Sequence, residues 1–342
     1  MLSMQKKRIL FSGGQTDFYF DASFDVLEKI VSREEAVIIT DENILKAHQR
    51  KLKGYNTIVL KPGEEYKVQQ TVDVIIDQLI AMGANRHNIL IGFGGGVITD
   101  ITGFVAGIFM RGVKVGYIPS TLLAMVDAAI GGKNGIDVGV YKNMVGLIRQ
   151  PSFLIYDYSL LKTLPLKEWQ NGFAEIIKHA CIKDAKMFAE LSQQSIAKYQ
   201  KQPLLLGALI KRNAVIKIKV VQEDEFETGE RKLLNFGHTL GHAIENMYEL
   251  SHGEAISIGM TYATLMSQQL LFFKSAESVI QLLQRYGLPT VASFDADKAF
   301  KVMLKDKKRA ADKIQYILLE KIGKGVVQPI QIEALKAIFK QF

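Results

Sequence analysis

The sequence predicts two domains of different class, an α/β domain with a mostly parallel sheet followed by a mostly α-helical domain. Short β-branched runs alternate with helical patterns up to about residue 157. From Glu168 to Tyr286, helical patterns follow one another with almost no strand signal. The length of 342 residues, of which 48% are hydrophobic, suffices for two cores. We therefore expect an α/β domain over residues 1–160 and a helical domain over residues 161–342.

Hydrophobic periodicity predicts the individual elements. In the clearest helical stretch, four residues recur at the spacing of one helix face, namely Val72, Ile75, Ile76 and Leu79. Because strands and helices alternate in the first domain, its sheet should be covered on both faces. The predicted elements are strands over residues 36–40, 57–60, 88–91, 113–118 and 153–156, helices over 69–82 and 101–110, and a hairpin over 313–319 and 325–328.

Composition and charge exclude several classes of protein. Lys and Arg total 43 and Asp and Glu total 35, so the net charge is 43 − 35 = +8. The basic residues are dispersed and accompany no zinc-finger or RNA-binding motif, so we expect an anionic small molecule and no nucleic acid. A single cysteine, Cys181, excludes an intramolecular disulfide. Because the sequence shows no apolar run of about 20 residues and no signal peptide, we expect a cytoplasmic protein without a membrane partner.

The most informative loop covers residues 92–100 and reads Gly-Phe-Gly-Gly-Gly-Val-Ile-Thr-Asp. It follows an apolar strand and opens onto a helical stretch. Consecutive glycines at such a junction let the backbone approach a phosphate, and the helix N-terminus supplies unpaired N–H donors. The loop is not the G-x-G-x-x-G dinucleotide fingerprint, and a tight turn without a ligand is the alternative.

Two further segments lie where α/β sheets bind ligands, at the carboxyl ends of expected strands. Residues 62–67 contain Glu64 and Lys67, which could hold ribose and phosphate groups. Asp41 directly follows an expected strand, where an acidic residue can bind a ribose hydroxyl. An exposed turn is the alternative for residues 62–67, and helix N-capping is the alternative for Asp41.

The second half of the sequence carries a candidate metal site. His238 and His242 lie four residues apart on one face of a helix, and His252 follows after a short gap. Upstream, Glu175 and His179 share a helix face in the same way. One carboxylate and two imidazoles with an open position suit a catalytic divalent metal, zinc first and then cobalt. On spacing alone His179 and His242 compete for a ligand role, and a buried polar pair is the alternative.

A third group consists of cations and amides without evident ion-pair partners in the sequence. Lys133 and Lys142 are the most informative of them, because residues 131–135 are glycine-rich and lack helical patterning. We expect a loop there, and loops carry function more often than packing. Solvated surface is the alternative for the group. Its other members are Arg111, Asn143, Lys178, Lys217, Arg231 and Asn235.

The sequence resembles the 3-dehydroquinate synthase family of sugar phosphate cyclases over nearly its whole length. The motifs occur in family order and at family spacing, which is far more specific than any one motif alone. They are Gly-Gly-Gly-Val-Ile-Thr-Asp at 94–100, Met-Arg-Gly at 110–112, Pro-Ser-Thr-Leu-Leu-Ala-Met-Val-Asp at 119–127, Gly-Gly-Lys at 131–133, Lys-Asn at 142–143, Phe-Ala-Glu-Ile-Ile-Lys at 173–178, Leu-Asn-Phe-Gly-His-Thr-Leu-Gly-His-Ala-Ile-Glu at 234–245 and His-Gly-Glu at 252–254.

The resemblance implies a fold and a reaction. The fold is a Rossmann-like N-terminal domain and a mostly helical C-terminal domain, usually in a homodimer. The reaction converts a phosphorylated keto-sugar acid, 3-deoxy-D-arabino-heptulosonate 7-phosphate, to 3-dehydroquinate and phosphate in the shikimate pathway. It uses NAD catalytically, since the C5 hydroxyl is oxidised, phosphate is eliminated and the ketone is reduced again. A divalent metal, zinc or cobalt, takes part.

The resemblance also implies roles for particular residues. The metal ligands would be Glu175, His238 and His252, which leaves His242 for proton transfer around C5. The NAD site would comprise Asp41, Gly63, Glu64, Lys67, Gly95, Gly96, Val97, Asp100, Ser120, Thr121, Lys133 and Lys142. The substrate and its phosphate would be bound by Asp127, Lys133, Asn143, Lys178, Lys217, Arg231, Asn235, Arg111 and one lysine of residues 307–308, which we assign as Lys307.

The sequence departs from the common family pattern beside the expected site. Asn134 stands where threonine is common, Asp137 where asparagine is common, and Arg149 where an aromatic residue is usual. These departures leave open another sugar phosphate cyclase, of the valiolone or inosose type. An iron-dependent alcohol or glycerol dehydrogenase and a binding protein with the same fold are less favoured alternatives. Retention of Lys217, Arg231 and Asn235 favours the carboxylated substrate.

Overall fold

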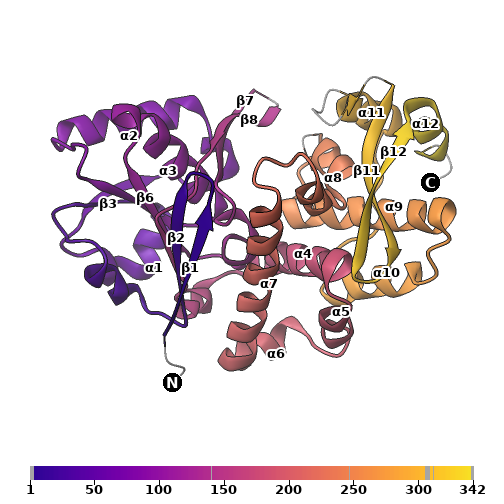
Figure 1. Ribbon diagram of the computed structural model, residues 1–342, viewed down its shortest axis with the longest axis horizontal. Coiled ribbons are helices and arrows are strands. Elements are labelled where there is room, and N and C mark those ends of the chain that lie inside the picture. Colours follow the sequence, from indigo (N-terminus) through magenta and orange to yellow (C-terminus); the bar gives the residue numbers. More distant parts are fainter. Residues whose placement is uncertain (1–3, 140, 246, 305–308, 311, 340–342) are drawn as a thin grey trace. The chain divides into compact units, whose positions relative to one another are not determined.

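The computed structural model describes residues 4–139, 141–245, 247–304, 309–310 and 312–339 (Figure 1). The chain divides into two compact units. Unit 1 comprises Met1–Glu168 and Gln202–Glu225, and unit 2 comprises Trp169–Lys201 and Phe226–Phe342. This division differs from a single boundary at residue 160, because a helix from the middle of the chain groups with unit 1.

Unit 1 is built on a seven-stranded sheet with the strand order β1-β2-β9-β6-β5-β3-β4. Neighbouring strands are parallel, except that β1 pairs antiparallel with β2. All five predicted strands are present, and the β1–β2 hairpin adds an edge that the sequence analysis did not predict. The strands are β1 (Gln5–Phe11), β2 (Gly14–Phe20), β3 (Ala36–Asp41), β4 (Asn56–Leu60), β5 (Ile89–Gly94), β6 (Lys114–Pro119) and β9 (Phe153–Ile155).

The two helices predicted over 69–82 and 101–110 are both present in unit 1, and the second of them begins earlier than predicted. The predicted apolar face of the second helix is buried through Val72, Ile75 and Leu79, and its fourth predicted member, Ile76, is half-buried. The helix predicted over 101–110 begins earlier, at Gly96, so the glycine loop leads directly into its first turn. The helices are α1 (Glu42–Leu52), α2 (Gln69–Ala81), α3 (Gly96–Ile108) and α7 (Pro203–Glu223).

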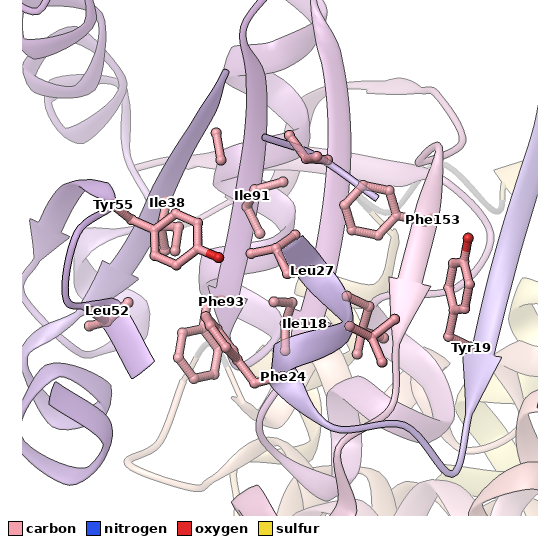
Figure 2. Close-up of a cluster of buried hydrophobic side chains, with 14 of the residues drawn as sticks. Tyr19, Phe24, Leu27, Ile38, Leu52, Tyr55, Ile91, Phe93, Ile118 and Phe153 are labelled. Atoms are coloured by element: carbon pink, nitrogen blue, oxygen red, sulfur yellow. The ribbon is translucent and has the colours of Figure 1, made fainter. Parts of the chain in front are cut away.

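An apolar cluster holds the unit 1 sheet in place (Figure 2). Ile38, Ile91 and Ile118 come from three neighbouring strands and are fully buried. Phe24 covers them from a short 3-10 helix, and its ring lies 5.2 Å from that of Phe93. Burial of each such side chain contributes about 1.5–3 kcal/mol. The cluster therefore fixes the strand ends from which the candidate site is built.

The glycine-rich stretch that was expected to be a loop leads into a β-hairpin, so that expectation is wrong. Strands β7 (Lys133–Val138) and β8 (Tyr141–Ile148) pair antiparallel. Gly135 and Gly146 face each other in this pair, and a Cβ at Gly146 would lie 2.3 Å from the Asn134 carbonyl oxygen. Glycine is therefore required for the close approach of the two strands, although it conceals the alternating pattern that predicts strands.

Asn134 has a structural role that explains one departure from the common family pattern. The Tyr117 hydroxyl donates to Asn134 Oδ1 over 2.6 Å. Asn134 Nδ2 in turn donates to the carbonyl oxygens of Gly132 (2.8 Å) and Arg149 (3.0 Å). Tyr117, Gly132 and Asn134 are buried and Arg149 is half-buried, so the amide connects β6 to the base of the β7–β8 hairpin through largely buried hydrogen bonds.

We expect Asn134→Ala to lower the free energy of unfolding by about 2–4 kcal/mol, because it removes the hydrogen bonds of the amide with the Tyr117 hydroxyl and with the carbonyl groups of Gly132 and Arg149. Urea denaturation followed by circular dichroism measures this loss. Val138→Ala, at an exposed position of the same hairpin, is the matched control and should change the unfolding free energy by less than about 0.5 kcal/mol. Equal effects of the two substitutions would contradict this role of Asn134.

Unit 2 is mostly helical, as predicted, and carries a small antiparallel sheet with the order β10-β11-β12. The predicted terminal hairpin is confirmed as β11 and β12. No helix among the described residues is both long and apolar enough to span a membrane. The elements are α4 (Leu166–Lys183), α5 (Ala185–Leu191), α6 (Ile196–Lys201), α8 (His238–Glu245), α9 (His252–Leu271), α10 (Ala276–Arg285), α11 (Ala296–Leu304), α12 (Ile332–Phe339), β10 (Arg309–Ala310), β11 (Lys313–Lys321) and β12 (Lys324–Gln331).

Candidate functional site

The residues expected to bind a nucleotide lie at one edge of the unit 1 sheet. Strands β4, β3, β5 and β6 are parallel neighbours in this order, so their carboxyl ends meet at the same edge. The chain changes direction across the sheet between β3 and β5, and open α/β sheets bind ligands at such a point. The residues gathered there are Asp41 at the end of β3, Gly63, Glu64 and Lys67 after β4, Gly95, Gly96, Val97 and Asp100 after β5, and Ser120 and Thr121 after β6.

The N-terminus of α3 offers backbone donors to an anion. Gly95 is its N-cap residue, and no side chain caps the helix. A Cβ at Gly95 would lie 3.0 Å from Thr121 Cγ2, and one at Gly96 would lie 3.2 Å from Ala128 Cβ. Glycine at these positions therefore keeps the helix end open. Unpaired N–H groups and the helix dipole together favour a phosphate at such an end.

Ser120 and Asp41 lie at the same edge but differ in whether their polar atoms already form hydrogen bonds. The Ser120 hydroxyl is buried and makes no hydrogen bond with any residue that the structure describes. A buried hydroxyl without a partner is unfavourable, which favours a ligand there. Asp41, by contrast, already accepts a hydrogen bond from the Ile44 N–H (2.9 Å) and caps α1. This is the N-capping role that was the alternative prediction for Asp41.

Lys67 joins the nucleotide segments to the β7–β8 hairpin. Its Nζ lies 2.6 Å from Asp100 Oδ2 and 2.7 Å from Asn143 Oδ1, and only 4% of its side chain is exposed. Burial lowers the pKa of Lys67, but Asp100 and Glu64 outweigh it and raise that pKa. Lys67 is therefore a buried cation held between three elements, rather than part of an exposed turn.

The hairpin and the turn after α3 carry three further predicted cations. Lys133 begins β7 and Lys142 lies on β8. Arg111 is exposed and forms no hydrogen bond or ion pair with a described residue. Met110, Arg111 and Gly112 have φ of 50°, 66° and 115°. Left-handed conformation costs a non-glycine residue about 1 kcal/mol or more, and such strain clusters at functional sites. The predicted role of Arg111 as a phosphate ligand remains a prediction.

Helix α7 brings Lys217 into unit 1. Its ammonium forms an ion pair with the Asp127 carboxylate and donates to the Asp127 carbonyl oxygen over 2.7 Å. Asp127 lies on a single π-helical turn, Ala124–Ala128, after β6. Sequence spacing cannot predict this pair, because the two residues are 90 positions apart.

In unit 2, three helices bring together the residues expected to bind a metal. Glu175 lies on α4, His238 begins α8 and His252 begins α9. One ligand atom from each lies within 4.8 Å of the others. Glu175 Oε1 is 3.1 Å from His252 Nε2 and 3.5 Å from His238 Nε2, and the carboxylate is fully buried. This set of one carboxylate and two imidazoles suits a divalent metal such as zinc.

Glycines allow these helices to approach closely enough. A Cβ at Gly259 on α9 would lie 1.9 Å from the Gly237 carbonyl oxygen, just before α8. A Cβ at Gly253 would lie 2.6 Å from Asn171 Cα on α4, and the Gly253 N–H donates to Asn171 Oδ1 over 3.0 Å. Larger residues would push the helices apart, so the glycines set the spacing of the ligand atoms.

Neighbouring groups orient the two histidines. His238 Nδ1 lies 3.1 Å from the Phe236 carbonyl oxygen, which directs Nε2 toward Glu175. His252 Nδ1 lies 3.5 Å from Glu245 Oε2. Burial lowers the pKa of His252, but Glu175 and Glu245 outweigh it and raise that pKa to about 10. The negative charge that holds a proton on this imidazole equally favours a metal cation there.

His242, one of the two histidines that compete for a ligand role on spacing alone, lies beside the candidate metal ligands. His242, Glu245 and His252 form a second group with ligand atoms within 4.8 Å, so His242 borders the candidate metal site. His179 is fully buried on α4. Glu245 was missed by the sequence analysis, although its place on the same helix as His238 is a usable signal.

Three further predicted residues of unit 2 lie near the metal ligands in the sequence, namely Lys178, Arg231 and Asn235. Lys178 is 1% exposed and forms an ion pair with Glu175. Arg231 is buried, and Asn235 Nδ2 donates to Glu227 Oε1 over 2.5 Å. Glu227 was also missed, because an acidic residue in a charged stretch carries no pattern of its own. The predicted phosphate ligand Lys307 lies outside the described residues.

Solved structures with the same fold define the class of protein. A 2-epi-5-epi-valiolone synthase from Streptomyces hygroscopicus subsp. jinggangensis 5008, with NAD⁺ and Zn²⁺ bound, has a TM-score of 0.85 at 25% identity and covers 100% of each chain. A 2-deoxy-scyllo-inosose synthase, complexed with carbaglucose-6-phosphate, NAD⁺ and Co²⁺, has a TM-score of 0.84 at 26% identity and covers 98% of this chain and 99% of that one. The fold is therefore that of the sugar phosphate cyclases.

Sequence comparison narrows the class to one family. Residues 57–171 match the family described as 3-dehydroquinate synthase N-terminal, and residues 172–309 match the one described as 3-dehydroquinate synthase C-terminal. A 3-dehydroquinate synthase of Coxiella burnetii (strain CbuG_Q212) is 40% identical over 316 residues, which is 88% of each chain. The chain belongs to the 3-dehydroquinate synthase family.

Proposed function

We propose that this chain converts 3-deoxy-D-arabino-heptulosonate 7-phosphate to 3-dehydroquinate and phosphate, in the cytoplasm and as a homodimer. The observation that carries the proposal is the convergence of one carboxylate and two imidazoles, from Glu175, His238 and His252, in a chain whose residues 57–171 and 172–309 match the 3-dehydroquinate synthase family. The +8 charge of the chain would further attract a substrate that carries both phosphate and carboxylate.

The nucleotide edge of unit 1 would hold NAD, which supplies an acceptor for the hydride from C5 when it is bound. The unpaired N–H groups of α3 would bind its pyrophosphate, since Gly95 leaves that helix end uncapped. The buried Ser120 hydroxyl would bind the same ligand, because it forms no hydrogen bond with any described residue. Glu64 and Lys67 would then bind ribose and phosphate oxygens, together with Oδ2 of Asp41, since the cap of α1 uses Oδ1.

Glu175, His238 and His252 would hold the divalent metal, zinc first and then cobalt. Their donor atoms fit it, since a fully buried carboxylate and two oriented imidazoles converge. A metal in this place supplies a Lewis acid for the C5 oxygen. His242 borders the set and would accept and return the proton of the C5 hydroxyl.

The other polar residues would position the substrate and stabilise its charges. Lys178, Lys217 and Arg231 would bind the carboxylate and hydroxyl groups, and Arg111 and Asn143 would bind the phosphate. A ketone at C5 makes the C6 proton acidic, and the departing phosphate dianion can accept that proton. The demand on the chain is therefore mainly positioning and electrostatic stabilisation.

We expect the chain to release phosphate from the heptulosonate phosphate when both NAD and a divalent metal are present. Phosphate is measured with a coupled assay, and the organic product is identified by mass spectrometry. Sedoheptulose 7-phosphate, which lacks the carboxylate, is the matched control substrate and should give no release. Release from the control alone would contradict the proposal and favour a cyclase of the valiolone type, whose fold this chain shares.

A further inference from the structure

Three residues of unit 1 close a ring of hydrogen bonds. The Asp137 N–H donates to the Lys67 carbonyl oxygen over 2.7 Å. The Asn143 N–H donates to Asp137 Oδ1 over 2.6 Å. Lys67 Nζ donates to Asn143 Oδ1 over 2.7 Å and completes the ring. Each bond joins a different pair of residues, so the ring connects the segment before α2 to both strands of the β7–β8 hairpin.

Asp137 holds Asn143 in an unfavourable backbone conformation. Asn143 has a φ of 52°, in the left-handed region, although it lies within β8. The carboxylate of Asp137 accepts the N–H of this residue, and the pairing of β7 with β8 shifts register beside Asp137. Only 9% of Asp137 is exposed, so water competes poorly for its carboxylate, although Asn143 itself is exposed. The carboxylate therefore offsets the cost of the left-handed backbone.

The ring also determines which way the Asn143 amide faces. Lys67 is a donor only, so it must meet the amide oxygen. The Asn143 NH₂ group then makes no hydrogen bond with any residue that the structure describes. An amide NH₂ that is held in this orientation presents two donors, which suits phosphate or hydroxyl oxygens. Lys67 cannot move to follow another position of Asn143, because Asp100 also holds its ammonium.

We propose that Asp137 is a positioning residue, which fixes the Asn143 backbone so that the amide NH₂ group faces the phosphorylated substrate. The inference rests on the proposed function, because the substrate defines what the amide binds. It concerns a residue that departs from the common family pattern. An asparagine at this position could accept the same N–H through its own Oδ1, whereas an alanine could not.

The test compares Asp137→Ala with the conservative Asp137→Asn in the full-length chain with NAD and metal. We expect Asp137→Ala to lower kcat/KM by about 100-fold, the effect of misplacing a group by about 1 Å. Asp137→Asn should restore kcat/KM to within about fivefold of the natural chain, since the acceptor is retained. The Kd for NAD, measured by calorimetry, should change by less than about threefold in both, because Asp100 keeps Lys67 in place.

A double-substitution cycle separates positioning from a general structural effect. If Asp137 acts through Asn143, adding Asp137→Ala to Asn143→Ala should lower kcat/KM by no more than about threefold further. Independent, multiplying losses would overturn the proposal. Val138→Ala, on the same strand and exposed, controls for disturbance of the hairpin. If the alanine variant does not fold, Asp137→Leu, which is of similar shape and lacks the acceptor, replaces it.

The outcomes separate this inference from the proposed function. If the natural chain releases no phosphate from the heptulosonate phosphate, the proposed function fails. If the natural chain is active and Asp137→Ala has the same kcat/KM, the positioning role of Asp137 fails while the function stands. Loss of activity in Asp137→Ala without recovery in Asp137→Asn would also overturn it, because the acceptor oxygen would then not be the property that matters.

Discussion

Glu175→Gln is expected to remove the metal from the protein and to lower kcat by at least about 1000-fold. The carboxylate is the only acidic member of the candidate ligand set, and both imidazoles lie within 3.5 Å of its Oε1. A neutral amide binds a divalent cation far more weakly than a carboxylate does. Metal content by mass spectrometry of the purified protein, together with the rate of phosphate release, measures both effects.

The same substitution also removes the ion pair between Glu175 and the Lys178 ammonium, which is 1% exposed. Removing one partner of a buried pair typically costs about 3–5 kcal/mol, so a fall in the melting temperature is expected as well. His252→Gln tests the metal site while both members of that pair remain in the protein. Glu333→Gln, at an exposed position of α12, is the control. Full metal content in both Glu175→Gln and His252→Gln would show that these residues are not the ligands.

Lys67→Met is expected to weaken NAD binding by about 10- to 100-fold, the range for losing a hydrogen bond to a charged group. It should also lower the free energy of unfolding by about 3–5 kcal/mol, because Asp100 loses the cation 2.6 Å away. Calorimetric titration with NAD and urea denaturation measure the two effects separately.

A loss of both NAD affinity and unfolding free energy would distinguish Lys67 from a surface lysine. Lys53→Met, at an exposed position after α1, is the control, and it should change neither quantity measurably. Asp100→Asn with Lys67→Met should recover part of the lost stability, because the uncompensated carboxylate is then gone. An unchanged Kd for NAD in Lys67→Met would contradict the place of this residue at the nucleotide edge.

Much of the fold can be predicted from the sequence, because apolar periodicity survives in most of its elements. The buried parallel strands read as continuous β-branched runs, and α2 shows its apolar face directly. The β7–β8 hairpin could not be predicted in this way. Gly135 and Gly146 are needed there for close packing of the strands, and glycine is the residue that most weakens a strand pattern.

The candidate site was predictable where its residues lie close together in the sequence. The spacing of His238 and His242 indicates directly that they share a helix face. Lys217 and Asp127, by contrast, are 90 positions apart and come into contact only in the folded chain. Glu227 and Asp137 show a further limit. Each acts through a hydrogen bond to a residue that the motifs do identify, Asn235 and Asn143 respectively. Neither acidic residue has a spacing that marks this role.

The central claim is that NAD acts as a catalyst that is regenerated within each turnover. The most direct measurement follows phosphate release and NADH absorbance together, with the metal-loaded chain, a small amount of NAD and excess heptulosonate phosphate. We expect many equivalents of phosphate per NAD, with no net accumulation of NADH. NADH that accumulates in proportion to the substrate consumed would contradict the claim and indicate a dehydrogenase of the same architecture.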